Sequence, residues 1–155
     1  MAWNGEGGIR SSISRRQVSL FASCHRSLPN FIDSRPSMLP TLNLSGDVIL
    51  AEHLSHRLGR IGLGDVVLVR SPMDPKRMVT KRVLGLEGHR LSFSADPLVG
   101  DGSVNVVVPK GHVWIQGDNL YASTDSRHFG PVPYNLIEGK ALLRVWPPEC
   151  FGSLR

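Results

Sequence analysis

A serine in a proline-bracketed segment is the first residue of this sequence that could act as a nucleophile. It is Ser37, which lies between Pro36 and Pro40 in the run 35–40 (RPSMLP). Each proline fixes its own φ and pushes the preceding residue toward an extended conformation, so the segment is stiff. A stiff backbone suits a nucleophile, but the same residue types also build ordinary turns. The segment taken alone leaves both interpretations open.

A lysine in an apolar strand-like run is a candidate general base. Lys81 belongs to the run 78–85 (MVTKRVLG). Because strand side chains alternate between two faces, Lys81 shares a face with Val79 and Val83. Such a surface disfavours the charged ammonium, so we expect the pKa of Lys81 to fall and its neutral amine to accept a proton. The alternative is a lysine whose stem lies along the valines while its ammonium remains in water.

A polar segment at residues 116–133 is rich in Asp, Asn, Ser and Thr. These side chains hydrogen-bond readily to nearby backbone groups, so the loop can be rigid without regular structure. Asp125 and Arg127 are placed to form an ion pair. A solvated surface loop is the alternative, and the carboxylates lack the spacing of a calcium-binding loop.

Short apolar runs separated by glycine and proline indicate strands, from residue 47 onward, which must position these side chains. The predicted strands are 47–51, 65–70, 78–84, 89–93, 104–108, 112–116 and 136–146. The run 85–88 (GLEG) predicts a hairpin between two strands, and Asp101-Gly102 predicts another turn. Residues 54–59 are expected to form a single helical turn. The body of the chain is therefore predicted to be mainly β.

The charge of the chain is concentrated near its beginning. The net charge is +5, and residues 1–36 hold +3 of it, which leaves +2 for the rest. The body therefore lacks the basic surface of a nucleic-acid-binding protein. Residues 1–35 are rich in Arg and Ser, as in an organelle transit peptide or a disordered basic tail. No window reaches the roughly 20 apolar residues of a membrane-spanning helix.

Several motifs in a fixed order together resemble those of the type I signal peptidases, and within them the members of the mitochondrial inner membrane. The resemblance covers residues 36–155, which we take as the catalytic domain, after the N-terminal segment 1–35. The motifs that carry it are 37–41 (SMLPT), 64–67 (GDVV), 81–88 (KRVLGLEG), 117–119 (GDN) and 123–127 (STDSR).

The resemblance implies a mainly β fold with a coiled, partly closed antiparallel β-sheet of the signal-peptidase catalytic type. It implies that Ser37 attacks the scissile carbonyl and that Lys81 takes the serine proton. Ser123 is then placed to orient the Lys81 amine, while Asp125 and Arg127 form a supporting ion pair. It implies no metal and no cofactor.

The mitochondrial members also imply a biological setting. It comprises precursor proteins with N-terminal sorting peptides as substrates, a second peptidase subunit as partner, and no nucleic acid. The expected location is the mitochondrial inner membrane, with the catalytic domain facing the intermembrane space.

One position departs from the family pattern. Bacterial relatives have serine or glycine two residues before the nucleophile, where it helps form the oxyanion hole, whereas this chain has Arg35. The backbone N–H of Ser37 remains as a donor. The altered front end suggests one alternative to an active processing peptidase, a catalytically impaired or non-enzymatic subunit of the peptidase complex. A second alternative is a self-cleaving repressor-like protease, which shares the Ser-Lys chemistry and fold type. The second needs a DNA-binding domain, for which the residues before Ser37 leave no room.

Overall fold

The computed structural model describes residues 37–94 and 103–154 of this chain. The expected N-terminal segment 1–35, with Arg35, and the predicted turn at Asp101-Gly102 lie outside these residues. Within the described part, no helix is long and apolar enough to cross a membrane. In chain order the elements are β1 (Val48–Glu52), β2 (Val66–Arg70), β3 (Met78–Gly85), β4 (Arg90–Ser94), β5 (Ser103–Val107), β6 (His112–Gln116), α1 (Ser126–Phe129), β7 (Val132–Pro133), η1 (Tyr134–Leu136), β8 (Ile137–Trp146), η2 (Pro148–Cys150) and β9 (Gly152–Ser153).

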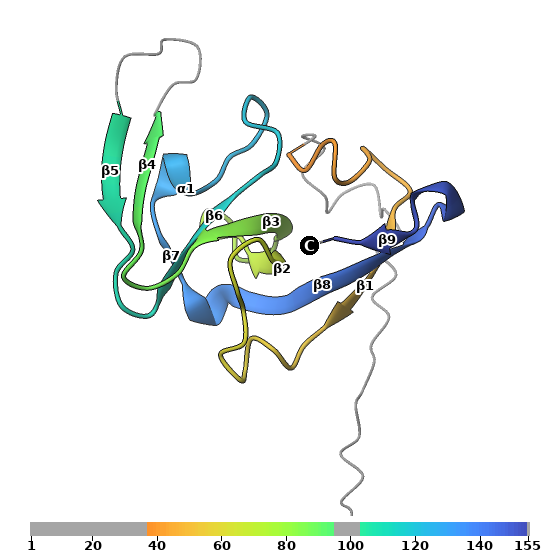
Figure 1. The fold of residues 1–155 in the computed structure, drawn as a ribbon, viewed down its shortest axis with the longest axis horizontal. Helices are drawn as coiled ribbons and strands as arrows, with labels where there is room; N and C mark the ends of the chain where they lie inside the picture. The colour runs from red at the N-terminus through yellow and green to blue at the C-terminus, as the bar shows by residue number, and fades with distance from the viewer. Residues whose placement is uncertain (1–36, 95–102, 155) are drawn as a thin grey trace, which may run out of the picture.

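Seven of the strands form one sheet in the order β1-β8-β2-β3-β6-β7, with β9 paired to β8. A separate two-stranded sheet joins β4 and β5, and it stands at the opposite side of the molecule from β1 and β9 (Figure 1). All the strand pairs are antiparallel. The predicted mainly β, antiparallel fold is therefore confirmed, and the path of the large sheet is open, running from β1 to β7.

The seven strands predicted from the sequence are all present, with each end within one residue of its expected position. Residues 54–59 form a hydrogen-bonded turn in which Leu58 N–H donates to the Leu54 carbonyl at 3.1 Å. The short elements α1, β7 and β9 were not predicted.

The predicted hairpin at residues 85–88 is wrong. Leu86 and His89 do close a turn, with a 3.0 Å backbone hydrogen bond, but the flanking strands do not pair with each other. Strand β3 pairs with β2 and β6, whereas β4 pairs with β5. The chain leaves the large sheet at Gly85, where a Cβ would come within 2.6 Å of Leu91 and 3.1 Å of Trp114. Because glycine has no Cβ, Gly85 allows the two sheets to approach each other closely at this point.

The core consists of two apolar clusters that meet at β2, whose residues 66–69 are buried on both faces. The Val67 cluster contains Ile61, Val67, Val69, Val83, Val113, Ile115, Val132 and Ile137. The Val66 cluster contains Met38, Ile49, Ala51, Val66, Leu68, Ala141 and Leu154. Each fully buried valine or leucine contributes about 1.5 to 3 kcal/mol of hydrophobic stabilisation, so the sheet is held firmly at its centre.

Strand β3 passes between these clusters and presents a different cation to each. Lys81 lies directly opposite Val67, while Arg82 lies opposite Val66. Residues directly opposite each other in an antiparallel pair project to the same face. Lys81 therefore lies on the face of the Val67 cluster, together with Val83 as the sequence predicted, and Arg82 lies on the face of the Val66 cluster.

Candidate active site

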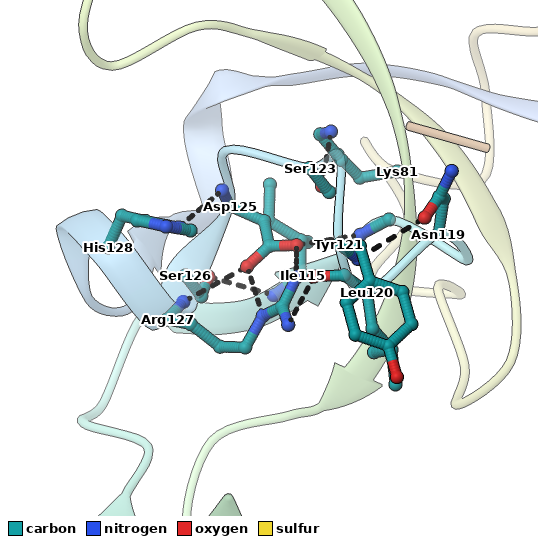
Figure 2. A network of polar contacts seen from close by, with 11 residues as sticks. Lys81, Ile115, Asn119, Leu120, Tyr121, Ser123, Asp125, Ser126, Arg127 and His128 are labelled. Atoms are coloured by element: carbon teal, nitrogen blue, oxygen red, sulfur yellow. Dashed lines mark hydrogen bonds and ion pairs between the residues drawn. The ribbon is translucent and has the colours of Figure 1, made fainter. Parts of the chain in front are cut away.

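The Lys81 amine is buried and meets a serine of the loop that follows β6. The Lys81 residue is only 3% exposed. Its Nζ donates to Ser123 Oγ at 2.9 Å, a contact between residues 42 positions apart in the chain (Figure 2). A buried ammonium loses the hydration that stabilises its charge.

Asp125 links this serine to a compact ion pair. Its carboxylate accepts from Arg127 Nε and Nη2, each at 2.9 Å, and from the backbone N–H of Gly117 at 3.0 Å. The side chains of Asp125 and Arg127 are 0% and 5% exposed. Arg127 also donates to the Leu120 carbonyl at 2.9 Å, which ties the loop after β6 to α1 (Figure 2). A bidentate pair of this kind is strong and geometrically specific.

The surroundings of Asp125 decide its charge. Burial alone would raise the pKa of the Asp125 carboxyl, but hydrogen bonds from Arg127, from the Ser123 hydroxyl and from the backbone N–H groups of Gly117 and Arg127 lower it below its ordinary value. Asp125 is therefore a carboxylate at neutral pH. Because the Ser123 hydroxyl bonds to this carboxylate, its oxygen is left to accept from Lys81.

Asp125 is also the N-cap of α1, where it accepts from the backbone N–H of Arg127. His128, three residues after the cap, completes a capping box. The hydroxyl of Ser126 accepts from the Ile115 N–H of β6 at 3.0 Å. This single helical turn therefore carries the ion pair on a rigid support.

Ser37 lies beside this network through Gly117 and Asn119. Its carbonyl oxygen accepts from the Asn119 N–H at 3.0 Å. A Cβ placed on Gly117 would collide with the Ser37 carbonyl oxygen and with Ser123 Oγ, so the Ser37 backbone and the Ser123 hydroxyl approach each other across this glycine. The fold thus brings together in one region five residues from separate parts of the sequence: Ser37, Lys81, Ser123, Asp125 and Arg127.

A second polar cluster, for which the sequence predicted no role, lies on the other face of β3. Arg82 Nε and Nη2 donate to the two carboxylate oxygens of Asp118, both at 2.8 Å. Thr41 Oγ1, four residues after Ser37, donates to Asp118 Oδ2 at 2.5 Å. This Arg82-Asp118-Thr41 clamp joins the chain after the serine to the loop after β6. The sequence signal was present, because Asp118 and Arg82 belong to the matched motifs, but their long-range contact was not visible.

The clamp is charged at neutral pH. Burial alone would raise the pKa of the Asp118 carboxyl, but hydrogen bonds from Arg82 and Thr41 and the positive charges of Arg82 and Lys81 hold it below its ordinary value. The hydrogen bond to Asp118 raises the pKa of Arg82 further above an already high value. In the described part of the chain, no three His, Cys, Asp or Glu side chains are grouped so that they could hold a metal ion.

Comparison with known proteins identifies the family of this chain. The family model described as signal peptidase, peptidase S26, matches residues 18–105 and 102–146, which is most of the chain. The chain belongs to the signal peptidase S26 family. The resemblance inferred from the motifs is thereby confirmed, and the protein is a serine-type endopeptidase of the signal-peptidase kind.

Three relatives of the S26 family show where this chain stands within it. It is 90% identical over 120 residues to the mitochondrial ATP-independent inner membrane protease subunit 1a of Arabidopsis thaliana, covering 77% of this chain and 71% of that protein. It is 49% identical to the mitochondrial inner membrane protease subunit 1 of Mus musculus, covering 79% of this chain and 72% of that protein. It is 40% identical to the mitochondrial inner membrane protease subunit 2 of Danio rerio, covering 73% of this chain and 61% of that protein.

Proposed function

We propose that this chain cleaves N-terminal sorting peptides from precursor proteins with a Ser37-Lys81 dyad. The observation that carries the proposal is the buried Lys81 amine, bonded to Ser123, in the region where Gly117 brings Ser123 and the Ser37 backbone together. A hydroxyl is a weak nucleophile until a nearby base accepts its proton, and a desolvated lysine is such a base.

The proposed reaction has two halves. The neutral Lys81 amine takes the proton of Ser37 Oγ as that oxygen attacks the scissile carbonyl, and the backbone N–H of Ser37 donates to the resulting oxyanion. Lys81 then returns the proton to the leaving amine, which frees the mature protein and leaves the sorting peptide as an ester on Ser37. A water molecule, deprotonated by Lys81, hydrolyses this ester and restores the enzyme.

The supporting residues act on the orientation of Lys81. Ser123 uses its only proton on the Asp125 carboxylate, so it accepts a hydrogen bond from the lysine amine. This leaves the lysine lone pair free for the Ser37 hydroxyl. Arg127 keeps Asp125 ionised and in place.

The names of the relatives support a setting for this chemistry. The matched proteins are subunits 1 and 2 of a mitochondrial inner membrane protease. We therefore assign the chain to the mitochondrial inner membrane, with its catalytic domain, residues 36–155, facing the intermembrane space. Its partner in this proposal is a second peptidase subunit, and its substrates are precursors delivered to that compartment.

The central test is Ser37→Ala. This variant should lower cleavage of a precursor on the order of 10⁶-fold and remain folded, because the hydroxyl is needed for the covalent step. Cleavage by the purified protein is followed by gel shift and by mass spectrometry of the released peptide. Ser92→Ala, at an exposed residue of β4, is the matched control and should keep normal activity.

Two outcomes would oppose the proposal in different ways. Normal cleavage by Ser37→Ala would refute Ser37 as the nucleophile. Inactivity of the unaltered chain, alone and with a second subunit, would indicate the alternative of a catalytically impaired subunit.

A further inference from the structure

Leu154 is linked in two independent ways to residues 37–41, the segment that begins with the proposed nucleophile: through a shared apolar cluster and through Arg82. Strand β9 (Gly152–Ser153) pairs with β8, and the Leu154 N–H donates to the Leu142 carbonyl at 3.2 Å. This pairing directs the Leu154 side chain inward, where it is 5% exposed. It lies in the Val66 cluster together with Met38, the residue directly after Ser37.

The second contact is made by the Leu154 carbonyl. It accepts from Arg82 Nη1 at 3.2 Å, and the same nitrogen donates to the Gly64 carbonyl at 2.7 Å. The other two nitrogens of this guanidinium hold Asp118. The carbonyls of Leu154 and Gly64 therefore hold Nη1 of the forked Arg82 guanidinium, while its Nε and Nη2 belong to the Arg82-Asp118-Thr41 clamp.

A cavity makes these hydrogen bonds important for Arg82. A mainly polar hollow of about 280 Å³ borders the guanidinium, and its lining includes Thr41, Arg82 and Leu154. Side-chain packing therefore does not hold Arg82 on this side. Its carbonyl partners determine where the fork points, and a planar fork binds a carboxylate well only in the correct orientation.

We propose that Leu154 is a positioning residue for the nucleophile. Its side chain packs in the same apolar cluster as Met38, directly after Ser37. Its carbonyl orients Arg82, which holds Thr41 through Asp118 at the far end of the segment. Both ends of the segment 37–41 thus depend on one residue that is remote in sequence. This inference rests on the proposed function of Ser37.

The test compares Leu154→Ala with Leu154→Met and with the matched control Leu58→Ala, at an exposed leucine. The probe is an internally quenched peptide that spans the processed junction of a precursor. Because small displacements of a nucleophile are costly, Leu154→Ala should lower kcat about tenfold while KM stays within about twofold. Leu154→Met should recover most of kcat, because it conserves volume. Leu58→Ala should match the unaltered protein.

A double variant separates positioning from general loss of stability. Arg82→Lys keeps the charge but loses the fork, so it should also lower kcat. If Leu154 acts partly through Arg82, the two changes combined should lower kcat clearly less than the product of their separate effects. All rates are measured at a temperature where circular dichroism shows each variant to be folded.

Several results would overturn the inference. An unchanged kcat in folded Leu154→Ala would do so. A double variant whose loss of kcat equals the product of the losses in Leu154→Ala and Arg82→Lys would also do so. If Leu154→Ala does not fold, Leu154→Val is used in its place and should lower kcat about threefold. An unchanged kcat in Leu154→Val would then contradict the inference. Ser37→Ala is measured first, because cleavage by this variant would refute the proposed function. If Ser37→Ala is inactive but Leu154→Ala has a normal kcat, only the present inference is refuted.

Discussion

At the residue scale, the proposed role of Lys81 as general base requires a buried lysine that can lose a proton. Lys81→Arg keeps the positive charge and much of the bulk, but a guanidinium stays protonated in proteins and cannot accept the serine proton. We predict that Lys81→Arg is as inactive as Lys81→Ala, with a loss of about 10² to 10⁴-fold in kcat. Single-turnover cleavage of a precursor peptide measures this loss.

The exposed lysines provide the controls for that experiment. Lys76→Arg and Lys110→Arg should keep near-normal activity. Substantial activity in folded Lys81→Arg would exclude Lys81 as the base and leave its charge as the important property.

The Asp125 carboxylate makes a prediction about stability and pH. Its folded-state pKa lies below the reference value of 3.8, so the unfolded state takes up the proton first as the pH falls. The stabilisation is therefore complete at neutral pH and is lost as the pH falls below 3.8 toward the folded-state pKa. We predict that Asp125→Asn lowers the free energy of unfolding by about 3 kcal/mol at pH 7 and by clearly less at pH 3.

Urea unfolding of the unaltered protein and of Asp125→Asn at both pH values measures this difference. Because both proteins share every other titrating group, the comparison isolates Asp125. An equal loss at pH 7 and pH 3 would contradict an ionised, hydrogen-bonded carboxylate.

Single residues also show how far the sequence could lead. The alternation of β3 predicted that Lys81 is buried with Val83, because face assignment needs only neighbouring residues. The role of Arg82 could not be predicted in this way, since its partners Asp118 and Leu154 are 36 and 72 residues away. Contacts of that range follow from strand order, which the sequence pattern does not reveal.

At the element scale, the turn from β6 into the site depends on one glycine. We predict that Gly117→Ala lowers kcat by at least about 10²-fold, because the added methyl group would force the Ser37 carbonyl and the Ser123 hydroxyl apart. It should also cost about 1 to 3 kcal/mol of stability. Steady-state kinetics and thermal unfolding measure the two effects.

The control for this substitution is Gly62→Ala. Its added Cβ would lie 3.6 Å from Asp65 Oδ2, an ordinary contact. It should keep normal kcat, and a normal kcat in Gly117→Ala would show that the close approach across this glycine is not needed.

The elements themselves were predictable to different degrees. Strands such as β2 and β8 have enough apolar residues to be recognised without tertiary information. In contrast, β7 and β9 have two residues each and exist only because longer strands lie beside them. The hairpin predicted at Gly85 failed for a related reason, because turn residues indicate a change of direction but not which strands pair afterwards.

At the scale of the whole molecule, the two sheets should differ in local stability. We predict that backbone amides of β4 and β5 exchange with solvent at least about 10²-fold faster than those of β2, because a two-stranded sheet is marginally stable and β2 is buried on both faces. Hydrogen exchange followed by mass spectrometry measures this difference. Equal protection would show that the small sheet unfolds only together with the large one.

Because Lys81 and Arg82 project to opposite faces of the sheet, the site is sensitive to whether an insertion or deletion before them has an odd or an even number of residues. Between the turn after β2 and Lys81, a single-residue deletion would bring the Arg82 guanidinium to the position beside Ser123, and a single-residue insertion would bring the Lys81 amine to the position beside Asp118. Either change reverses the faces of the two cations. A two-residue change would preserve the faces and shift only the pairing along the strand. Over generations, this stretch of the gene should therefore accept many substitutions at its exposed positions but almost no change of odd length.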